Sequence, residues 1–245
     1  MDESNIQRKS LPVENSCSLI TKLNNSVCTN TSSYEETSPE NCSVDHEADL
    51  KNSREGRGGE ELSAELSVAL QRCLLGGAGI DLSSLVVVEG KICWDLYING
   101  LVVSSDGNLL DALGTAIKAA LSNTGIPKVN VAAGASGDEQ PEVDVSDEEF
   151  LQFDTSRVPV IVTLTKVGRH YIVEATSEEE SQMCLAVSIS INRQGRICGL
   201  TERGGAGLDP SIILDMISVA KTVSEQLINT LDSHIAAAEA GEEES

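Results

Sequence analysis

Arg57 is the residue whose setting best fits a site for a phosphate group. It stands among glycines in the run Arg54-Glu-Gly-Arg-Gly-Gly59, directly before a predicted helix. Backbone N–H groups, the positive end of the helix dipole and a guanidinium would then meet at one point, which favours an anion. A helix-capping turn is the competing interpretation. Two other glycine-rich stretches, 76–79 and 204–207, lack the residue order of phosphate loops and predict turns and helix ends.

The other reactive residue types do not form a recognisable catalytic or metal site. The three histidines have no serine, cysteine or aspartate arrangement beside them, so we expect no nucleophile activated by a base. No two of the seven cysteines lie two to four residues apart, which argues against zinc. Glu178, Glu179 and Glu180 are consecutive and point in different directions, which is typical of an exposed connection. We therefore expect neither a metal nor a cofactor.

The acidic excess limits the partners that the isolated chain can attract. The formal net charge is -22, and aromatic residues make up only 2% of the chain. Such a charge repels nucleic acid, and few rings are available to stack on bases. Residues 134–157 carry eight carboxylates and a single basic residue, Arg157, which predicts a solvated loop and a short edge element.

With no apolar signal core and no run of about eighteen apolar residues, we expect a soluble intracellular protein without a membrane segment.

The predicted elements begin after a long N-terminal segment. Residues 1–53 are rich in Ser, Asn and Glu and show no sustained period, so we expect a disordered tail. Helices are predicted at about 60–75, at 109–122 with Asn108 as N-cap, and from Pro210 onwards with Asp209 as N-cap. Strands are predicted in three hairpins, 85–88 with 91–103, 158–166 with 170–175 and 185–192 with 196–201, and in a short strand at 128–131. Residues 239–245 predict an acidic C-terminal tail.

The order of these elements predicts an α+β fold. No run of alternating strands and helices is long enough for a doubly wound sheet, and the hairpins are antiparallel. Helices packed on a mixed, largely antiparallel sheet are therefore expected. Trp94 alternates with Ile92 and Leu96 along one strand, so we expect it in the core or an interface and not as a platform for bases.

Several motifs in register resemble a single family. They are Arg54-Glu-Gly-Arg-Gly-Gly-Glu-Glu-Leu62, Cys93-Trp-Asp-Leu-Tyr97, Asp106-Gly-Asn-Leu-Leu-Asp-Ala-Leu113, Asn123-Thr-Gly-Ile-Pro127, Val158-Pro-Val-Ile-Val-Thr-Leu-Thr-Lys166 and Gly207-Leu-Asp-Pro210. In this order they are similar to the ring subunits of the RNA exosome, members of the RNase PH superfamily. The resemblance implies an RNase PH-like fold, of the ribosomal protein S5 domain 2-like type, over residues 54–238. Family members begin with further strands, so we expect an N-terminally incomplete fold, as in a shortened or alternatively spliced product.

The same resemblance implies a departure from the family's chemistry. Active relatives hold phosphate with an arginine soon after an Asp-Gly-Gly turn, where this chain has Leu110. They also use aspartates on a later strand and loop, but no Asp occurs from 155 to 208. A leucine cannot bind an oxyanion, and the general acid is missing too. We therefore predict a non-catalytic structural subunit of the exosome core ring, without catalytic residues.

The resemblance further implies a role in 3′-to-5′ RNA processing and degradation, including rRNA maturation and mRNA turnover, in the nucleus, nucleolus and cytoplasm. The expected partners are other RNase PH-like ring subunits, cap subunits and RNA within the assembled complex. Arg57 and Arg203 are the candidate RNA contacts. Two alternatives stay open: an active phosphorolytic 3′-to-5′ exoribonuclease, and a stand-alone acidic protein-interaction module.

Overall fold

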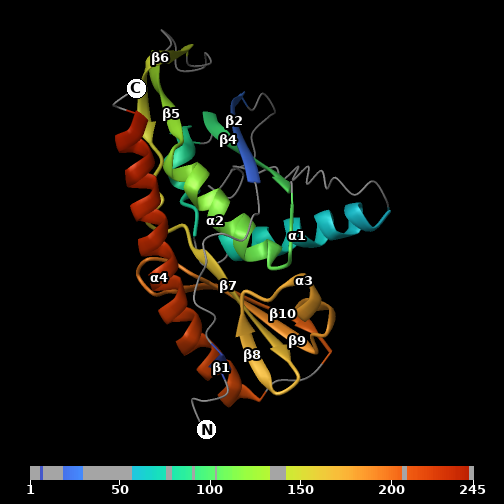
Figure 1. Ribbon diagram of the computed structural model, residues 1–245. Coiled ribbons are helices and arrows are strands. Elements are labelled where there is room, and N and C mark those ends of the chain that lie inside the picture. Colours follow the sequence, from blue (N-terminus) through green and yellow to red (C-terminus); the bar gives the residue numbers. More distant parts are fainter. Residues whose placement is uncertain are drawn as a thin grey trace.

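The computed structural model describes residues 6–7, 19–29, 57–75, 79–89, 92–102, 104–132, 142–205 and 209–242. Their α-helices are α1 (Arg57–Leu75), α2 (Leu109–Ser122), α3 (Ser177–Ser181) and α4 (Pro210–Glu242), with a 3₁₀ turn at Leu82–Leu85. The strands are β1 (Ile6–Gln7), β2 (Leu19–Thr29), β3 (Val86–Val88), β4 (Ile92–Val102), β5 (Gly125–Ala132), β6 (Glu142–Gln152), β7 (Val160–Val167), β8 (His170–Val173), β9 (Leu185–Ile191) and β10 (Ile197–Gly204). Figure 1 shows their arrangement.

The described strands form three sheets. The largest has the order β1-β8-β7-β9-β10, and the others have the orders β2-β4-β3 and β5-β6. All their pairs are antiparallel except β1 with β8. The predicted hairpins β3–β4, β7–β8 and β9–β10 are confirmed, as is the expectation of a mixed, largely antiparallel α+β fold.

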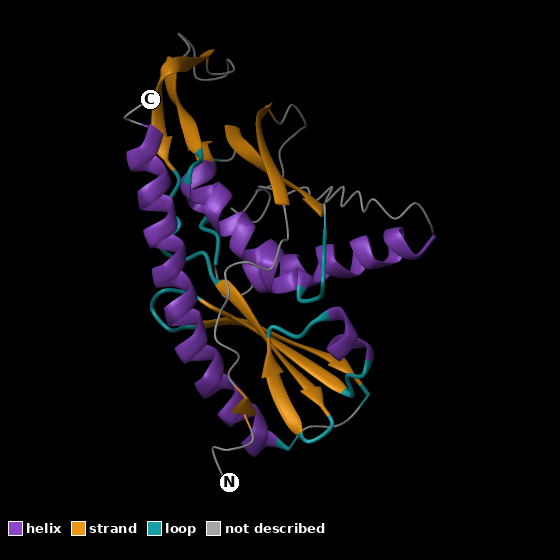
Figure 2. Cartoon of the chain, viewed as in Figure 1, coloured by secondary structure: helices purple, strands orange, loops and turns teal. Residues whose placement is uncertain are grey.

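Helices and sheets alternate in layers (Figure 2). Helix α4 packs on β7 and β9 from one side of the five-stranded sheet, while α1 and α2 pack on β9, β10 and β7 from the other. The sheet that contains β4 lies beyond α1 and α2, because Trp94 and Leu96 of β4 share a core cluster with Leu113 of α2 and Leu66 of α1. Trp94 is 7% exposed, so its predicted place in the core is confirmed.

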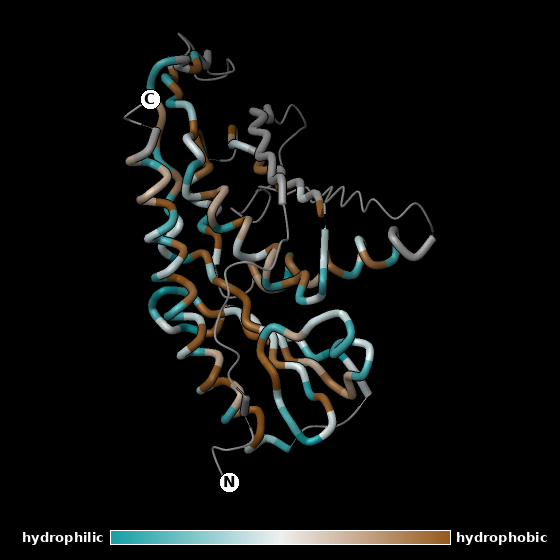
Figure 3. The backbone as a smooth tube through the Cα atoms, viewed as in Figure 1, coloured by the Kyte–Doolittle hydropathy of each residue, from teal (hydrophilic) through white to brown (hydrophobic). Residues whose placement is uncertain are grey.

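Strand β7 supplies side chains to two separate cores because successive residues of a strand point to opposite faces. Val162 and Leu164 pack with Met216 of α4 in one cluster. Ile161 packs with Leu113 of α2 in the other. In Figure 3 much of the central sheet is brown, the colour of apolar residues, and brown residues recur along α4, which packs on it. Both faces of the central strand are thus buried.

Helix α2 is fitted closely to β7 and to the segment before it. A Cβ atom at Gly114 would lie 2.8 Å from Cδ1 of Ile161, so the absence of a side chain lets the helix approach the strand. One turn later, the Lys118 ammonium donates hydrogen bonds to the carbonyl oxygens of Thr155 (3.0 Å) and Val158 (2.7 Å). Burial lowers the pKa of Lys118 to about 8. The position of α2 along β7 is therefore fixed at successive turns.

The structure differs from the sequence-based expectation in three segments. Strands β1 and β2 lie within the segment expected to be disordered, the rest of which is outside the described residues. Strand β2 pairs with β4 over its whole length, a long-range partner that local composition does not reveal. Strand β6 is longer than the predicted short edge element because it pairs with β5. Helix α4 continues to Glu242, into the predicted acidic tail.

We expect Gly114→Leu to lower the free energy of unfolding by about 1–3 kcal/mol, because the new side chain must displace Ile161 from a packed core. Denaturant unfolding followed by circular dichroism measures the change. Gly205→Leu is the matched control, since a Cβ at Gly205 meets nothing within 4 Å, and we expect it to stay within about 0.5 kcal/mol of the parent. Equal losses in the two variants would contradict the tight fit of α2 on β7.

Candidate functional site

The turn that leads into α2 is held in a conformation that brings its backbone against another loop. Gly107 has φ +101°, and a Cβ there would lie 2.5 Å from the carbonyl oxygen of Ala175 and 2.7 Å from the backbone nitrogen of Ser177. Only glycine fits this approach without strain. Asn108 follows with φ 50°, a left-handed conformation that Asn tolerates better than most residues. The turn is therefore specified by its sequence, Asp-Gly-Asn.

The prediction that Asn108 is the N-cap of α2 is confirmed. In its left-handed conformation the residue makes no side-chain cap hydrogen bond. Its backbone N–H instead donates to Oε1 of Glu180 at 3.1 Å. A carboxylate from a distant part of the chain thus lies at the positive end of the helix, where negative charge is stabilised.

Helix α3 is attached to the same turn from the other side. The Ser177 N–H donates to the carbonyl oxygen of Asp106 (2.7 Å), and the Ser177 hydroxyl donates to the Asp106 carboxylate (2.8 Å). Thr176 and Glu179 form a capping box at the start of α3, in which each side chain accepts from the other residue's backbone N–H. These bonds fix the short helix that carries Glu180.

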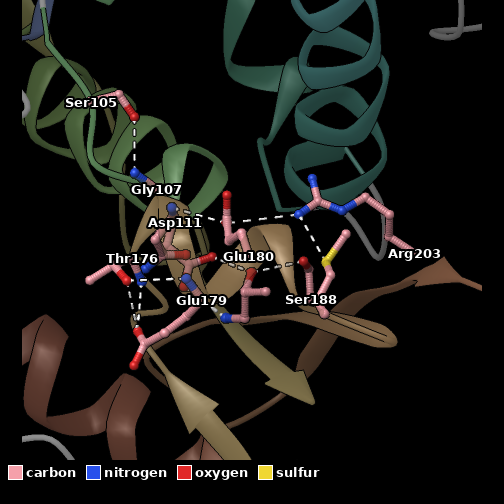
Figure 4. A network of polar contacts seen from close by, with 11 residues as sticks. Ser105, Gly107, Asp111, Thr176, Glu179, Glu180, Ser188 and Arg203 are labelled. Atoms are coloured by element: carbon pink, nitrogen blue, oxygen red, sulfur yellow. Dashed lines mark hydrogen bonds and ion pairs between the residues drawn. The ribbon is translucent and has the colours of Figure 1, made fainter. Parts of the chain in front are cut away.

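Glu180 also faces Arg203, which lies on β10. Oε1 of Glu180 is 3.8 Å from Nη2 of Arg203, and their side chains are 27% and 51% exposed. Figure 4 shows the Glu180 side chain between the turn at Gly107 and the Arg203 guanidinium. Because the ion pair is long and partly exposed, its own contribution to stability is small. The Glu180 carboxylate matters because it neutralises two positive groups, the N-terminal end of α2 and the Arg203 guanidinium.

A second carboxyl group, that of Asp111, lies in the first turn of α2 and points into the protein. Its Oδ2 accepts from the Thr163 N–H at 2.7 Å and its Oδ1 from the Thr163 hydroxyl at 2.5 Å. The Thr163 hydroxyl is also 2.8 Å from that of Ser188. Burial raises the pKa of Asp111 to about 7, although the Thr163 hydrogen bonds oppose this shift. The carboxyl group ties α2 to β7 and is not accessible to a substrate.

Leu110, between Asn108 and Asp111, is a partly buried side chain that packs against the core cluster of α1, α2 and β4. It offers no hydrogen-bond donor to a ligand. The start of α2 therefore presents backbone donors and an apolar packing residue, and Glu180 of α3 accepts a hydrogen bond from the Asn108 N–H. The anionic group at this backbone is the carboxylate of Glu180, and α2 supplies neither a cationic side chain at position 110 nor an accessible acid.

The predicted site residues lie on different elements. Arg57 is the first residue of α1, and its side chain is outside the described part of the structure. Arg203 is exposed on β10 and is the partner of Glu180. The expectation that residues 178–180 form only an exposed connection is wrong for Glu179 and Glu180, which are half-buried and hydrogen bonded. The spacing of Thr176 and Glu179, typical of a capping box, could have indicated this helix start.

The described residues show no arrangement typical of a metal centre or of a membrane-spanning helix. Among the described residues, no group of three or more His, Cys, Asp or Glu side chains is placed to hold a metal ion. Of the helices in this part of the chain, none is long and apolar enough to cross a membrane.

Two family descriptions match the sequence. That of the 3′ exoribonuclease family, domain 1 (RNase PH), matches residues 10–127, and that of domain 2 of the same family matches residues 157–223. Together they cover well over half of the chain. The boundary between them falls between α2 and β7, the two elements that Asp111 joins.

The chain matches only part of the length of its individual relatives. The chain is 38% identical over 146 residues to a Dictyostelium discoideum protein whose name describes it as an exosome complex exonuclease, RRP42, and this match spans 60% of the chain and 45% of the relative. It is 32% identical over 173 residues to the exosome complex component Rrp42 of Methanothermobacter thermautotrophicus, over 71% of the chain and 61% of the relative. The chain thus spans about half to three fifths of the relatives it matches.

Solved structures share the fold. An archaeal exosome core subunit superimposes with a TM-score of 0.63 at 23% identity, over 87% of this chain and 76% of that one. A chain of the Archaeoglobus fulgidus exosome with RNA bound to its active site gives a TM-score of 0.61 at 24% identity, over 86% of this chain and 78% of that one. The predicted RNase PH-like fold is confirmed.

The pKa of Asp111 makes stability depend on pH. Because the pKa is about 7 in the folded chain, against an ordinary value of 3.8, the unfolded chain releases this proton first as the pH rises. The stabilisation associated with Asp111 is therefore complete below about pH 4 and is lost progressively up to about pH 7. Between pH 5 and pH 8 we expect a loss on the order of 3 kcal/mol from this group.

Asp111→Asn tests this expectation, since an amide can accept from the Thr163 N–H and donate to the Thr163 hydroxyl without titrating. Denaturant unfolding of both proteins at pH 5 and pH 8 gives the comparison. The variant should lose less stability than the parent over this interval, by about 3 kcal/mol. The same pH dependence in both proteins would show that Asp111 does not titrate between these values.

Proposed function

We propose that this chain, which belongs to the RNase PH family of 3′ exoribonuclease domains, is a structural subunit of an RNA exosome ring and does not itself cleave RNA. Its relatives that bear the names of exosome components support the ring assignment. Its proposed partners are other RNase PH-like ring subunits, cap subunits and RNA that passes through the assembled complex. The proposed role is support of 3′-to-5′ RNA processing and degradation, including rRNA maturation and mRNA turnover.

The observation that carries the non-catalytic part of the proposal is the position of Leu110. The first turn of α2 is where backbone N–H groups favour an anion, and the side chain there belongs to the packed core. Phosphorolysis needs a cationic clamp on the attacking phosphate and a group that handles the proton. Leu110 supplies no clamp, and residues 155–208 contain no aspartate.

Charge supports the proposal that other subunits attract the RNA. With a formal net charge of -22, the isolated chain repels a polyanion over the range of several ångströms set by salt screening. Within a ring, basic neighbours would supply the attraction, while Arg57 and Arg203 are the proposed backbone contacts of this chain. The nucleus, nucleolus and cytoplasm are the proposed locations, since RNA processing and turnover take place there.

Two measurements test this proposal. Purified chain incubated with single-stranded RNA and inorganic phosphate should release no nucleoside diphosphate above a phosphate-free control, because the clamp is missing. Co-expression with RNase PH-like ring subunits of the same organism should yield a complex that survives gel filtration. Phosphate-dependent diphosphate release would establish the enzyme alternative, and a chain that stays monomeric in the presence of those subunits would contradict the ring assignment.

A further inference from the structure

We propose that Glu180 acts as a built-in anion that closes the position between the first turn of α2 and Arg203 to external phosphate groups. This inference deepens the proposed non-catalytic role, because it gives a second reason, independent of Leu110, why the chain should not hold phosphate. The ligand class it concerns is the phosphate oxyanion, either as free inorganic phosphate or as a phosphodiester of RNA.

Positive charge converges at the position that Glu180 occupies. The N-terminus of α2, a helix of 14 residues, carries partial positive charge on its free N–H groups. The guanidinium of Arg203 approaches the same position from β10, within 3.8 Å of the carboxylate oxygen that the Asn108 N–H contacts at 3.1 Å. A helix end and an arginine that share one oxygen atom form a typical arrangement for an anion.

The chain places its own carboxylate at this position, on a short helix that hydrogen bonds hold in place. The backbone N–H of Glu180 donates to the carbonyl oxygen of Thr176 at 2.8 Å, and the capping box begins the same short helix. Ser177 bonds twice to Asp106, so α3 cannot move away without breaking contacts to the turn before α2. The tight backbone approach at Gly107 adds to this. Glu180 is therefore held in place by the fold and does not depend on the weak ion pair with Arg203.

The Glu180 carboxylate therefore opposes the binding of a second anion at this position. A second anion at this position would lie within a few ångströms of the Glu180 carboxylate, and like charges about 4 Å apart at a protein surface repel by several times the thermal energy. The side chain also fills the space in front of the Asn108 N–H. Removal of Glu180 should leave the helix end and Arg203 unneutralised and open.

The test uses the full chain and inorganic phosphate, titrated by calorimetry at low ionic strength. The parent should show no saturable binding. Glu180→Ala should bind phosphate saturably, at least about tenfold more tightly than the detection limit that the parent sets, because one repulsive charge is removed at the site. Glu178→Ala is the matched control, since Glu178 is an exposed residue of the same helix and its loss changes the net charge equally. Glu180→Ala with Arg203→Ala should lose the gain.

A second arm titrates a short oligouridylate, followed by fluorescence anisotropy, and distinguishes the two sources of phosphate. A gain in Glu180→Ala for either ligand, absent in Glu178→Ala, supports the inference and names the source. If Glu180→Ala binds neither ligand better than Glu178→Ala does, the inference is overturned. Should Glu180→Ala fail to fold by circular dichroism, Glu180→Gln keeps the acceptor for the Asn108 N–H and removes the charge, and the same comparison with Glu178→Gln decides.

The outcome is separable from that of the proposed function. If Glu180→Ala binds neither inorganic phosphate nor the oligouridylate better than Glu178→Ala does, the role of Glu180 is removed and the proposed non-catalytic role rests on Leu110. Diphosphate release by the parent chain would refute the non-catalytic role whatever the variants bind.

Discussion

The packing of α2 on β7 is the constraint on which the rest of the described structure depends. The contacts recur at helical spacing along one face of α2: Asp111 meets Thr163, Gly114 meets Ile161, and Lys118 meets the carbonyl of Val158. Two of the three bury a titratable group, which is costly unless its hydrogen bonds are satisfied. The fold meets this condition with hydroxyl, amide and carbonyl partners. A shift of α2 along β7 would leave Asp111 and Lys118 buried without their hydrogen-bond partners. These contacts therefore specify one alignment of the helix on the strand.

This alignment also connects the two family segments, because α2 is the last helix of the first segment and β7 is the first strand of the second. The turn before α2 then touches α3, which lies within the second segment. The Leu110 packing, the Glu180 contact and the Asp111 anchor all belong to one short stretch at the start of α2. One short stretch thus contributes contacts to the core cluster, to α3 and to β7.

Much of the fold could be predicted from sequence because its signals are local. Helical periodicity, the Gly-containing turns of the hairpins and the capping residue Asp209 all act within a few residues, and the structure has Asp209 accepting from the Ser211 N–H. The family motifs placed these elements in order. Glu180 was missed because its partner Asn108 is 72 residues away, and nothing in three consecutive glutamates distinguishes the one that faces inward.

The same limit applies to the other differences. Asn108 is a common capping residue, and its sequence context gave no sign that the backbone would turn left-handed and present its N–H to a distant acid. Strand β2 required a partner, β4, that only tertiary structure supplies. The burial of Asp111 was equally hidden, since an acid in the first turn of a helix is ordinarily exposed and favourable there. Long-range contacts decided each of these cases.

The order of elements along the chain has a consequence for how the protein is made. The face of β7 and β9 that carries Val162, Leu164 and Val187 is covered by α4, which follows every strand in the sequence. During translation the strands leave the ribosome first, and domains complete their packing only when the missing element arrives. One whole side of the central sheet therefore remains uncovered until α4 has been synthesised. A nascent chain stalled before Pro210 would present that surface to chaperones.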